Sequence, residues 1–181
     1  MGTKRLFVSL EFPATVAAIL ADLDPGMRGV RWVRAEQVHL TLAFLGNVEA
    51  EVQSNLQNQL KTIQFTHFFT PLQGIGVFPA RGRPKIVWVG VGQGHPHLFQ
   101  LHKKVADAAL AAGIEPDLRP WHPHITLARC QDVSGQALQP FLRRHADLDL
   151  GVFSIEEFHL KSSRLTPAGS IYTTEFTVAA S

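Results

Sequence analysis

The sequence predicts a mixed fold of strands and helices, of the α/β or α+β class, built as two similar halves. The segment HLTLA at residues 39–43 recurs almost unchanged as HITLA at residues 124–128. In both halves an apolar strand and then a helix precede the repeated segment. This repetition favours two lobes related by approximate two-fold symmetry, with the repeated strands facing each other across a cleft.

In the first half, each element is predicted from the spacing of apolar residues and from the turn residues that follow them. We expect, in chain order, a strand at 5–10, a helix at 16–23 that ends at Asp24-Pro25-Gly26, a strand that ends at Gly46, a helix at 52–63, and extended chain at 65–78 with a turn near Gly74 and Gly76.

The second half repeats this order after the Gly/Pro loop at residues 79–84. Its first strand is rich in Ile, Val and Trp, which favour strands. We expect, in chain order, a strand at 85–91, a helix at 98–112 that ends at Gly113, the strand PHITLARC ending at Cys130, a helix from about Gly135 that extends toward Leu148, and strands at 152–161 and 171–178 joined by a turn with Pro167 and Gly169.

The composition indicates a folded, cytoplasmic protein. Hydrophobic residues make up 45% and charged residues 18% of the 181 residues, so disorder is disfavoured. The net charge of +2 argues against tight nonspecific DNA binding but permits a local basic patch. Cys130 is the single cysteine, which excludes an intrachain disulfide. We expect no secretory leader and no membrane association. The sequence does not define an oligomeric state.

The repeated segments carry the residues that point to chemistry. Side chains alternate between the two faces of a strand, so His39 and Thr41 share one face, as do His124 and Thr126. The apolar residues between them can anchor each strand on the core. Two imidazoles and two hydroxyls then surround one space, which suits hydrolysis of a phosphodiester by an acid and a base without a metal or other cofactor.

With its flanking segments, the chain resembles the 2H phosphoesterase superfamily, and within it the bacterial and archaeal RNA 2′,3′-cyclic phosphodiesterases, also called 2′-5′ RNA ligases. Five segments occur in the order typical of that family: RLFVSL, HLTLAFLG, GVFPARGRPKIVWVGV, PHITLARC and LKSSRLTPAGSIYTT. The resemblance implies a single bilobal α+β domain over residues 1–181. Each lobe would have an antiparallel-rich sheet and helices, and a central cleft would carry both motifs.

The resemblance also implies an activity and the residues that perform it. The substrate would be an RNA with a 2′,3′-cyclic phosphate terminus, such as a tRNA fragment, or a small cyclic nucleotide, and the product a 2′-phosphomonoester. His39 would donate a proton to the leaving 3′ oxygen, and His124 would activate water. Thr41 and Thr126 would bind phosphate oxygens, and Arg129 would contact the phosphate, provided that the strand ends or bulges near Ala128.

Several further residues have two interpretations each. Phe44 is expected in the core, with contact to an RNA base as the alternative. Arg81 and Arg83 fit either an RNA contact or an ordinary solvated loop. Trp121 can stack on a base or pack at the rim of the cleft. The histidines at positions 95, 97 and 102 are expected at the surface rather than in a metal site.

Three other functions are compatible with these residues. One is a 2′-5′ RNA ligase, in which an RNA 5′-hydroxyl replaces water as the nucleophile. Another is a noncatalytic RNA-binding module, which the two complete His-x-Thr motifs disfavour. The third is a metal-dependent hydrolase.

Overall fold

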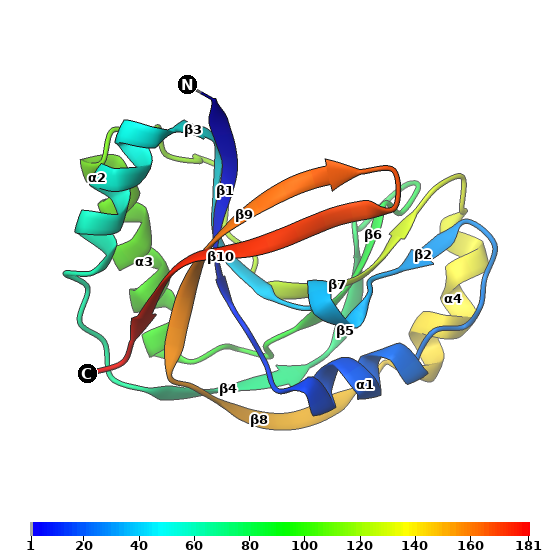
Figure 1. The fold of residues 1–181 in the computed structure, drawn as a ribbon. Helices are drawn as coiled ribbons and strands as arrows, with labels where there is room; N and C mark the ends of the chain where they lie inside the picture. Colours follow the sequence, from blue (N-terminus) through cyan, green and yellow to red (C-terminus); the bar gives the residue numbers. More distant parts are fainter. Residues whose placement is uncertain (1) are drawn as a thin grey trace.

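The computed structural model describes residues 2–181 and contains an eight-stranded antiparallel sheet, a two-stranded sheet and the helices packed against them (Figure 1). The strands are β1 (Thr3–Leu10), β2 (Val30–Trp32), β3 (Leu40–Glu49), β4 (Phe68–Gln73), β5 (Ile75–Phe78), β6 (Ile86–Gly90), β7 (His124–Cys130), β8 (Asp149–Ile155), β9 (Glu157–Thr166) and β10 (Gly169–Ala179). The helices are α1 (Ala14–Asp22), α2 (Ala50–Leu60), α3 (Pro96–Ala111), α4 (Gly135–Arg144) and the short 3₁₀ helix η1 (Ala35–Gln37).

The large sheet has two equivalent halves that meet at its centre. Its order is β10-β9-β1-β3-β7-β6-β5, and β2 pairs with β7. The halves meet at the pair Leu40 of β3 and Ile125 of β7. These two residues hold the same place in the repeated segment, so an approximate two-fold axis passes between them. The axis exchanges β1 with β6 and β9 with β5, and it brings β4 and β8 together as the small sheet.

The α+β class and the two similar halves are confirmed. The strand–helix–strand order occurs as β1-α1-β3 and again as β6-α3-β7. The expected strand at 152–161 was wrong, because Glu156 separates β8 from β9 and the two strands belong to different sheets. Two further details differ. Strand β2 was not predicted, since its three residues are held mainly by pairing with β7, and Leu148 lies beyond the end of α4.

One face of the large sheet forms the core. Leu40, Leu42, Ile125 and Leu127 are at most 1% exposed, and helices α2 and α3 pack against each other and against β3. The other face carries the histidine and threonine of both motifs, and we call it the histidine face. This arrangement is expected of an antiparallel sheet with one face in the core. Within the part of the chain that the structure describes, no helix has both the length and the hydropathy needed to cross a bilayer.

Both motif strands contain a β-bulge at the same place. The pairing of β3 with β1 skips Leu42, and the pairing of β7 with β6 skips Leu127. An extra residue of this kind reverses the alternation of faces for the residues that follow it. Phe44 and Arg129 therefore lie on the histidine face, although regular alternation would place both in the core.

Candidate active site

The two motif histidines have the same backbone environment. The Nδ1 atom of His39 lies 2.7 Å from the carbonyl oxygen of Gln37, and that of His124 lies 2.6 Å from the carbonyl oxygen of His122. Because a carbonyl can only accept, Nδ1 carries the hydrogen in both rings. In the neutral ring Nε2 is then an acceptor, available for proton transfer. In His39 this atom also lies 2.9 Å from the Thr41 hydroxyl, which donates to it.

The surroundings of both rings favour the neutral form. Burial lowers the pKa of His39 and outweighs the Gln37 carbonyl, which favours the protonated ring; the charges of Lys161 and His124 lower this pKa further, while Glu11 raises it. Burial also lowers the pKa of His124, against the effect of the His122 carbonyl. Since a charge on His124 acts on His39, the two rings are electrostatically coupled.

Aromatic side chains from other strands pack against the two imidazoles. The ring centroids of Phe7 and Tyr172 lie 5.1 Å and 5.4 Å from that of His39. On the other half, Phe78 packs edge-on against His124 at 5.0 Å. Sequence reasoning assigned no role to these three residues. They are distant from the motifs in the chain, and only the order of strands in the sheet brings them together.

Arg129 reaches the side of the sheet where His39 lies. It is directly opposite Arg31 of β2 and Ile86 of β6 on the histidine face. Burial raises the pKa of Tyr172, and the charges of Arg129 and Arg5 oppose this rise. Arg129 is therefore in electrostatic contact with a residue that touches His39. The bulge at Leu127 supplies the geometry that the sequence left open.

The remaining predicted residues differ in their access to the histidines. The prediction that Phe44 is in the core was wrong: its side chain is 62% exposed, and it lies opposite Phe7 on the histidine face. Trp121 is half-buried, and its Nε1 donates to the Thr41 carbonyl at 3.1 Å. Arg81 and Arg83 are exposed on the loop that begins after Phe78.

The histidines at 95, 97 and 102 do not form one cluster. His95 and His97 lie together at the start of α3, with ring centroids 4.9 Å apart. The His102 ring packs on Trp121, with the ring centroids 3.9 Å apart. Both ring nitrogens of His102 are buried, so the expectation of a surface histidine was wrong for this residue. Among residues 2–181, no three His, Cys, Asp or Glu side chains are grouped as metal ligands.

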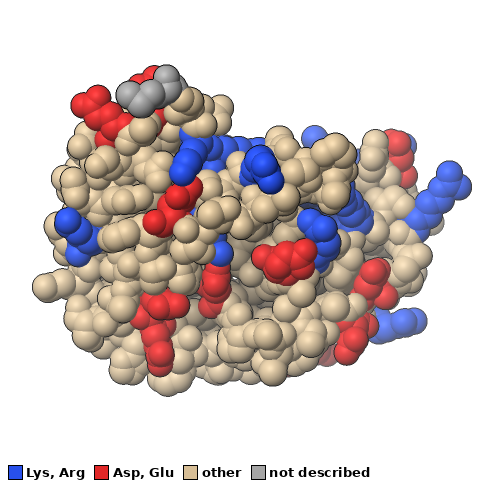
Figure 2. Space-filling model, viewed as in Figure 1, with Lys and Arg blue, Asp and Glu red and all other residues tan. Residues whose placement is uncertain are grey.

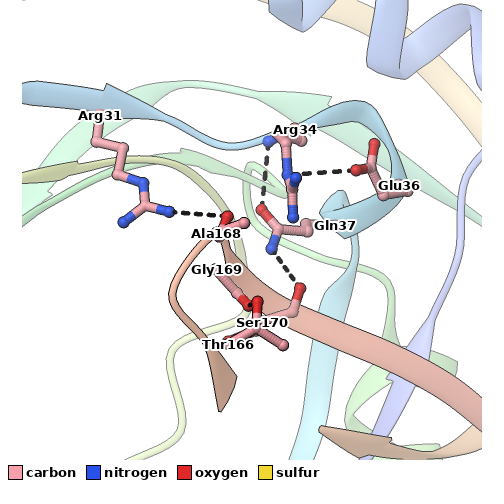
Figure 3. A network of polar contacts seen from close by, with 8 residues as sticks. All are labelled: Arg31, Arg34, Glu36, Gln37, Thr166, Ala168, Gly169 and Ser170. Atoms are coloured by element: carbon pink, nitrogen blue, oxygen red, sulfur yellow. Dashed lines mark hydrogen bonds and ion pairs between the residues drawn. The ribbon is translucent and has the colours of Figure 1, made fainter. Parts of the chain in front are cut away.

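A polar network connects the His39 segment to the β9–β10 hairpin (Figure 3). The side chain of Gln37 donates to the Ser170 carbonyl at 2.8 Å and accepts from the Arg34 main chain at 3.4 Å. Arg31 donates to the carbonyl of Ala168 at the tip of the hairpin. The residue whose carbonyl holds the His39 ring is thus itself held by the same hairpin that supplies Tyr172.

Comparisons with known proteins agree with the two-fold organisation. The family model described as LigT like Phosphoesterase matches the chain twice, at residues 6–88 and 89–172, so that each match contains one motif. The chain is 36% identical over 152 residues to the RNA 2′,3′-cyclic phosphodiesterase of Aeropyrum pernix, covering 83% of this chain and 86% of that protein. It is 35% identical over 173 residues to the protein of the same name from Aquifex aeolicus, covering 92% and 90%.

Solved structures show the same fold. The crystal structure of E. coli LigT in apo form superposes with a TM-score of 0.83 at 28% identity, over 100% of this chain and 99% of that one. E. coli LigT complexed with 3′-AMP superposes with a TM-score of 0.81, also at 28% identity and over 99% of both chains. On this double match and these relatives, the chain belongs to the LigT-like phosphoesterase family.

Proposed function

We propose that this protein opens the 2′,3′-cyclic phosphate at the end of an RNA to leave a 2′-phosphomonoester, using His39 and His124 as proton donor and acceptor without a metal. The observation that carries the proposal is the equivalence of the two rings. Each is fixed through Nδ1 to the main-chain carbonyl two residues earlier, with Nε2 directed away from that carbonyl, and the two motif strands meet at the sheet centre. The names of the relatives from Aeropyrum pernix and Aquifex aeolicus support the substrate class.

The reaction needs one proton removed and one supplied. The base takes a proton from water as it attacks phosphorus, and the acid protonates the 3′ oxygen as its bond to phosphorus breaks. The resemblance to the 2H enzymes assigns the acid to His39 and the base to His124. Because burial favours both neutral rings, the negative charge of the bound phosphate is needed to favour the protonated form of the acid.

The phosphate itself would be held by hydroxyl and guanidinium groups. Thr41 and Thr126 lie on the histidine face beside their histidines and would donate to nonbridging oxygens, with the Thr41 hydroxyl turning its hydrogen from His39 Nε2 to the phosphate. Arg129 would add a charge-assisted hydrogen bond, which stabilises the charge that develops in the transition state. Its coupling to Tyr172 supports a position near His39.

Two further groups would contact the RNA next to the reacting end. Phe44 is exposed on the histidine face, where its ring would stack on a base. Arg81 and Arg83 would contact the backbone from their exposed loop. Figure 2 shows Lys and Arg side chains gathered along the upper edge of the visible surface near the β9–β10 hairpin. Trp121 would support Thr41 rather than contact a base, because its N–H is bound to the Thr41 carbonyl.

The test is product analysis on an oligoribonucleotide with a 2′,3′-cyclic end, with and without excess EDTA. We expect a 2′-phosphate in both reactions. A longer, 2′-5′-joined product from two RNA halves would support a ligase instead, and binding without any new product a noncatalytic RNA-binding module. Loss of activity in EDTA that one divalent ion restores would contradict the metal-independent mechanism. Comparing the rates of hydrolysis of tRNA fragments and of small cyclic nucleotides defines the substrate. We propose that the reaction takes place in the cytoplasm.

A further inference from the structure

The two-fold symmetry of the sheet is broken at the position that faces each histidine. On the second half, Gly90 of β6 lies directly opposite His124. On the first half, Leu10 lies opposite Leu40, so continuing the antiparallel register by one residue places Glu11 across from His39. Side chains opposite each other in an antiparallel pair have Cβ atoms about 5 Å apart. The register thus points to a carboxylate on the His39 side at the position that glycine occupies beside His124, and the charge of Glu11 acts on His39.

The neighbouring strand breaks the symmetry a second time. Lys161 of β9 lies opposite Phe7 of β1, and the equivalent position in the other half is Phe78 of β5, opposite Ile86. Phe78 packs against His124. One histidine thus has an apolar neighbour where the other has a lysine.

The two charged residues on the His39 side form an ion pair with each other. The Lys161 ammonium contacts Glu11 Oε1, and the side chains are 14% and 42% exposed. The second Glu11 oxygen lies 3.8 Å from Nε2 of His159, which is also 3.4 Å from Glu157. The titratable groups that act on or touch His39 are therefore Glu11 from the end of β1, Lys161 from β9, Tyr172 from β10 and His124 from β7. His159 of β9 lies beyond Glu11.

We propose that the Glu11–Lys161 ion pair balances the charge around His39, and that this pair makes the two motif histidines chemically inequivalent. Neither residue touches the reacting atoms in this scheme; both act through His39. The inference rests on the proposed function only in that His39 exchanges a proton during turnover.

The balance follows from the opposite effects of the two charges. The Glu11 carboxylate favours the protonated imidazole of His39, and the Lys161 ammonium disfavours it. While the pair is intact the two effects oppose each other. Removing either partner leaves the other charge uncompensated beside a largely buried ring, where a nearby charge has a strong effect on protonation.

The experiment is an NMR titration of the histidine imidazoles in three variants, with the His39 signal assigned by its loss in His39→Gln. We expect Lys161→Met to raise the His39 titration midpoint by about half a unit to one unit, and Glu11→Gln to lower it by a similar amount. The double variant should return close to the original midpoint, and Lys161→Arg should leave it nearly unchanged. The midpoint of His124 should move much less than that of His39, through the coupling between the two rings alone.

The matched control is Glu175→Gln, which removes a different ion pair, 2.8 Å long, between β10 and β1. This substitution should shift the titration midpoint of neither His39 nor His124. A His39 midpoint that stays within about 0.2 units in both single variants, or equal shifts of His39 and His124, would overturn the inference.

The same variants assign the two limbs of the pH profile of kcat/KM for a cyclic nucleotide. Only the limb that belongs to His39 should move, and it should move in the direction of the NMR midpoint. A protein without phosphodiesterase activity would contradict the proposed function, yet the NMR titration would still decide the role of the ion pair.

Discussion

The proposed chemistry depends on two histidine side chains, and in each the two ring nitrogens have different surroundings. In both His39 and His124 one nitrogen is bound to a main-chain carbonyl, so the ring cannot rotate freely and the other nitrogen is presented in a fixed direction. The sequence located these two residues because a His-x-Thr repeat within a strand is a local signal. It could not locate Tyr172 or Glu11, whose roles depend on which strands are neighbours.

At the same scale, replacing either histidine should stop turnover. We expect His39→Ala and His124→Ala each to lower kcat roughly 10²- to 10⁴-fold, because each removes one proton-transfer group. RNA binding should be largely retained, and the exposed residue His67 offers the control His67→Ala. Steady-state kinetics on a cyclic-ended RNA measure the effect. Normal turnover in both variants would refute the two-histidine mechanism.

A single residue, His102, contributes to the pH dependence of stability. Burial lowers its pKa, and neither of its buried ring nitrogens has a hydrogen-bond partner. The unfolded chain therefore takes up a proton at higher pH than the folded protein, and stability is lost as the pH falls from about 6.5 toward the lower folded pKa. His39 and His124 contribute with the same sign.

Replacing His102 by Phe should make this dependence weaker. We expect the decrease in Tm between about pH 7.5 and about pH 5 to be smaller in His102→Phe than in the original protein, because one protonation that favours unfolding is removed. Thermal unfolding followed by circular dichroism at several pH values provides the measurement. An unchanged decrease in Tm would show that His102 does not contribute.

At the scale of elements, the bulges and the β9–β10 hairpin determine which side chains meet. Phe44 was expected in the core as a large apolar residue, and regular alternation would also place it there, but the bulge at Leu42 brings it to the histidine face. A one-residue bulge leaves little trace in the apolar pattern of a strand, so the sequence could state the alternatives for Arg129 but could not choose between them. The hairpin contributes through Gln37, which it holds by a hydrogen bond to Ser170.

The hairpin contact predicts an effect on catalysis from outside the motifs. Gln37→Ala removes the side-chain bonds to Ser170 and Arg34 but keeps the carbonyl that binds His39. With that carbonyl less firmly placed, we expect kcat to fall roughly threefold to thirtyfold, with a smaller change in KM. Gln59→Ala on the exposed side of α2 is the matched control. Equal kinetics for the two variants would show that the network does not position His39.

For the whole molecule, the repeated segment predicted two similar halves because a duplicated strand–helix–strand pattern is visible in the apolar spacing. How the halves join was not predictable from that spacing. The two motif strands become neighbours through Leu40 and Ile125, and the large sheet is continuous from β10 to β5. The position of the proposed active site at this junction follows from the two-fold axis between these residues.

The junction predicts that stability and activity decrease together. Ile125 is 0% exposed, and Ile125→Ala should lower the free energy of unfolding by about 2–5 kcal/mol through the cavity it leaves. Because the residue belongs to the second motif and pairs with Leu40 of the first, kcat should fall as well. Val105→Ala in α3, equally buried, controls for lost packing alone. Urea unfolding and kinetics on both variants make the comparison, and equal activity in the two would contradict a special role for the junction.

The most direct test of the account is a crystal structure with a slowly hydrolysed 2′,3′-cyclic phosphorothioate nucleotide. We predict that Nε2 of His39 and Nε2 of His124 both lie within about 3 Å of substituent atoms on the same phosphorus, from opposite sides. A ligand phosphorus contacted by only one of the two rings, or bound away from both, would contradict the two-histidine mechanism.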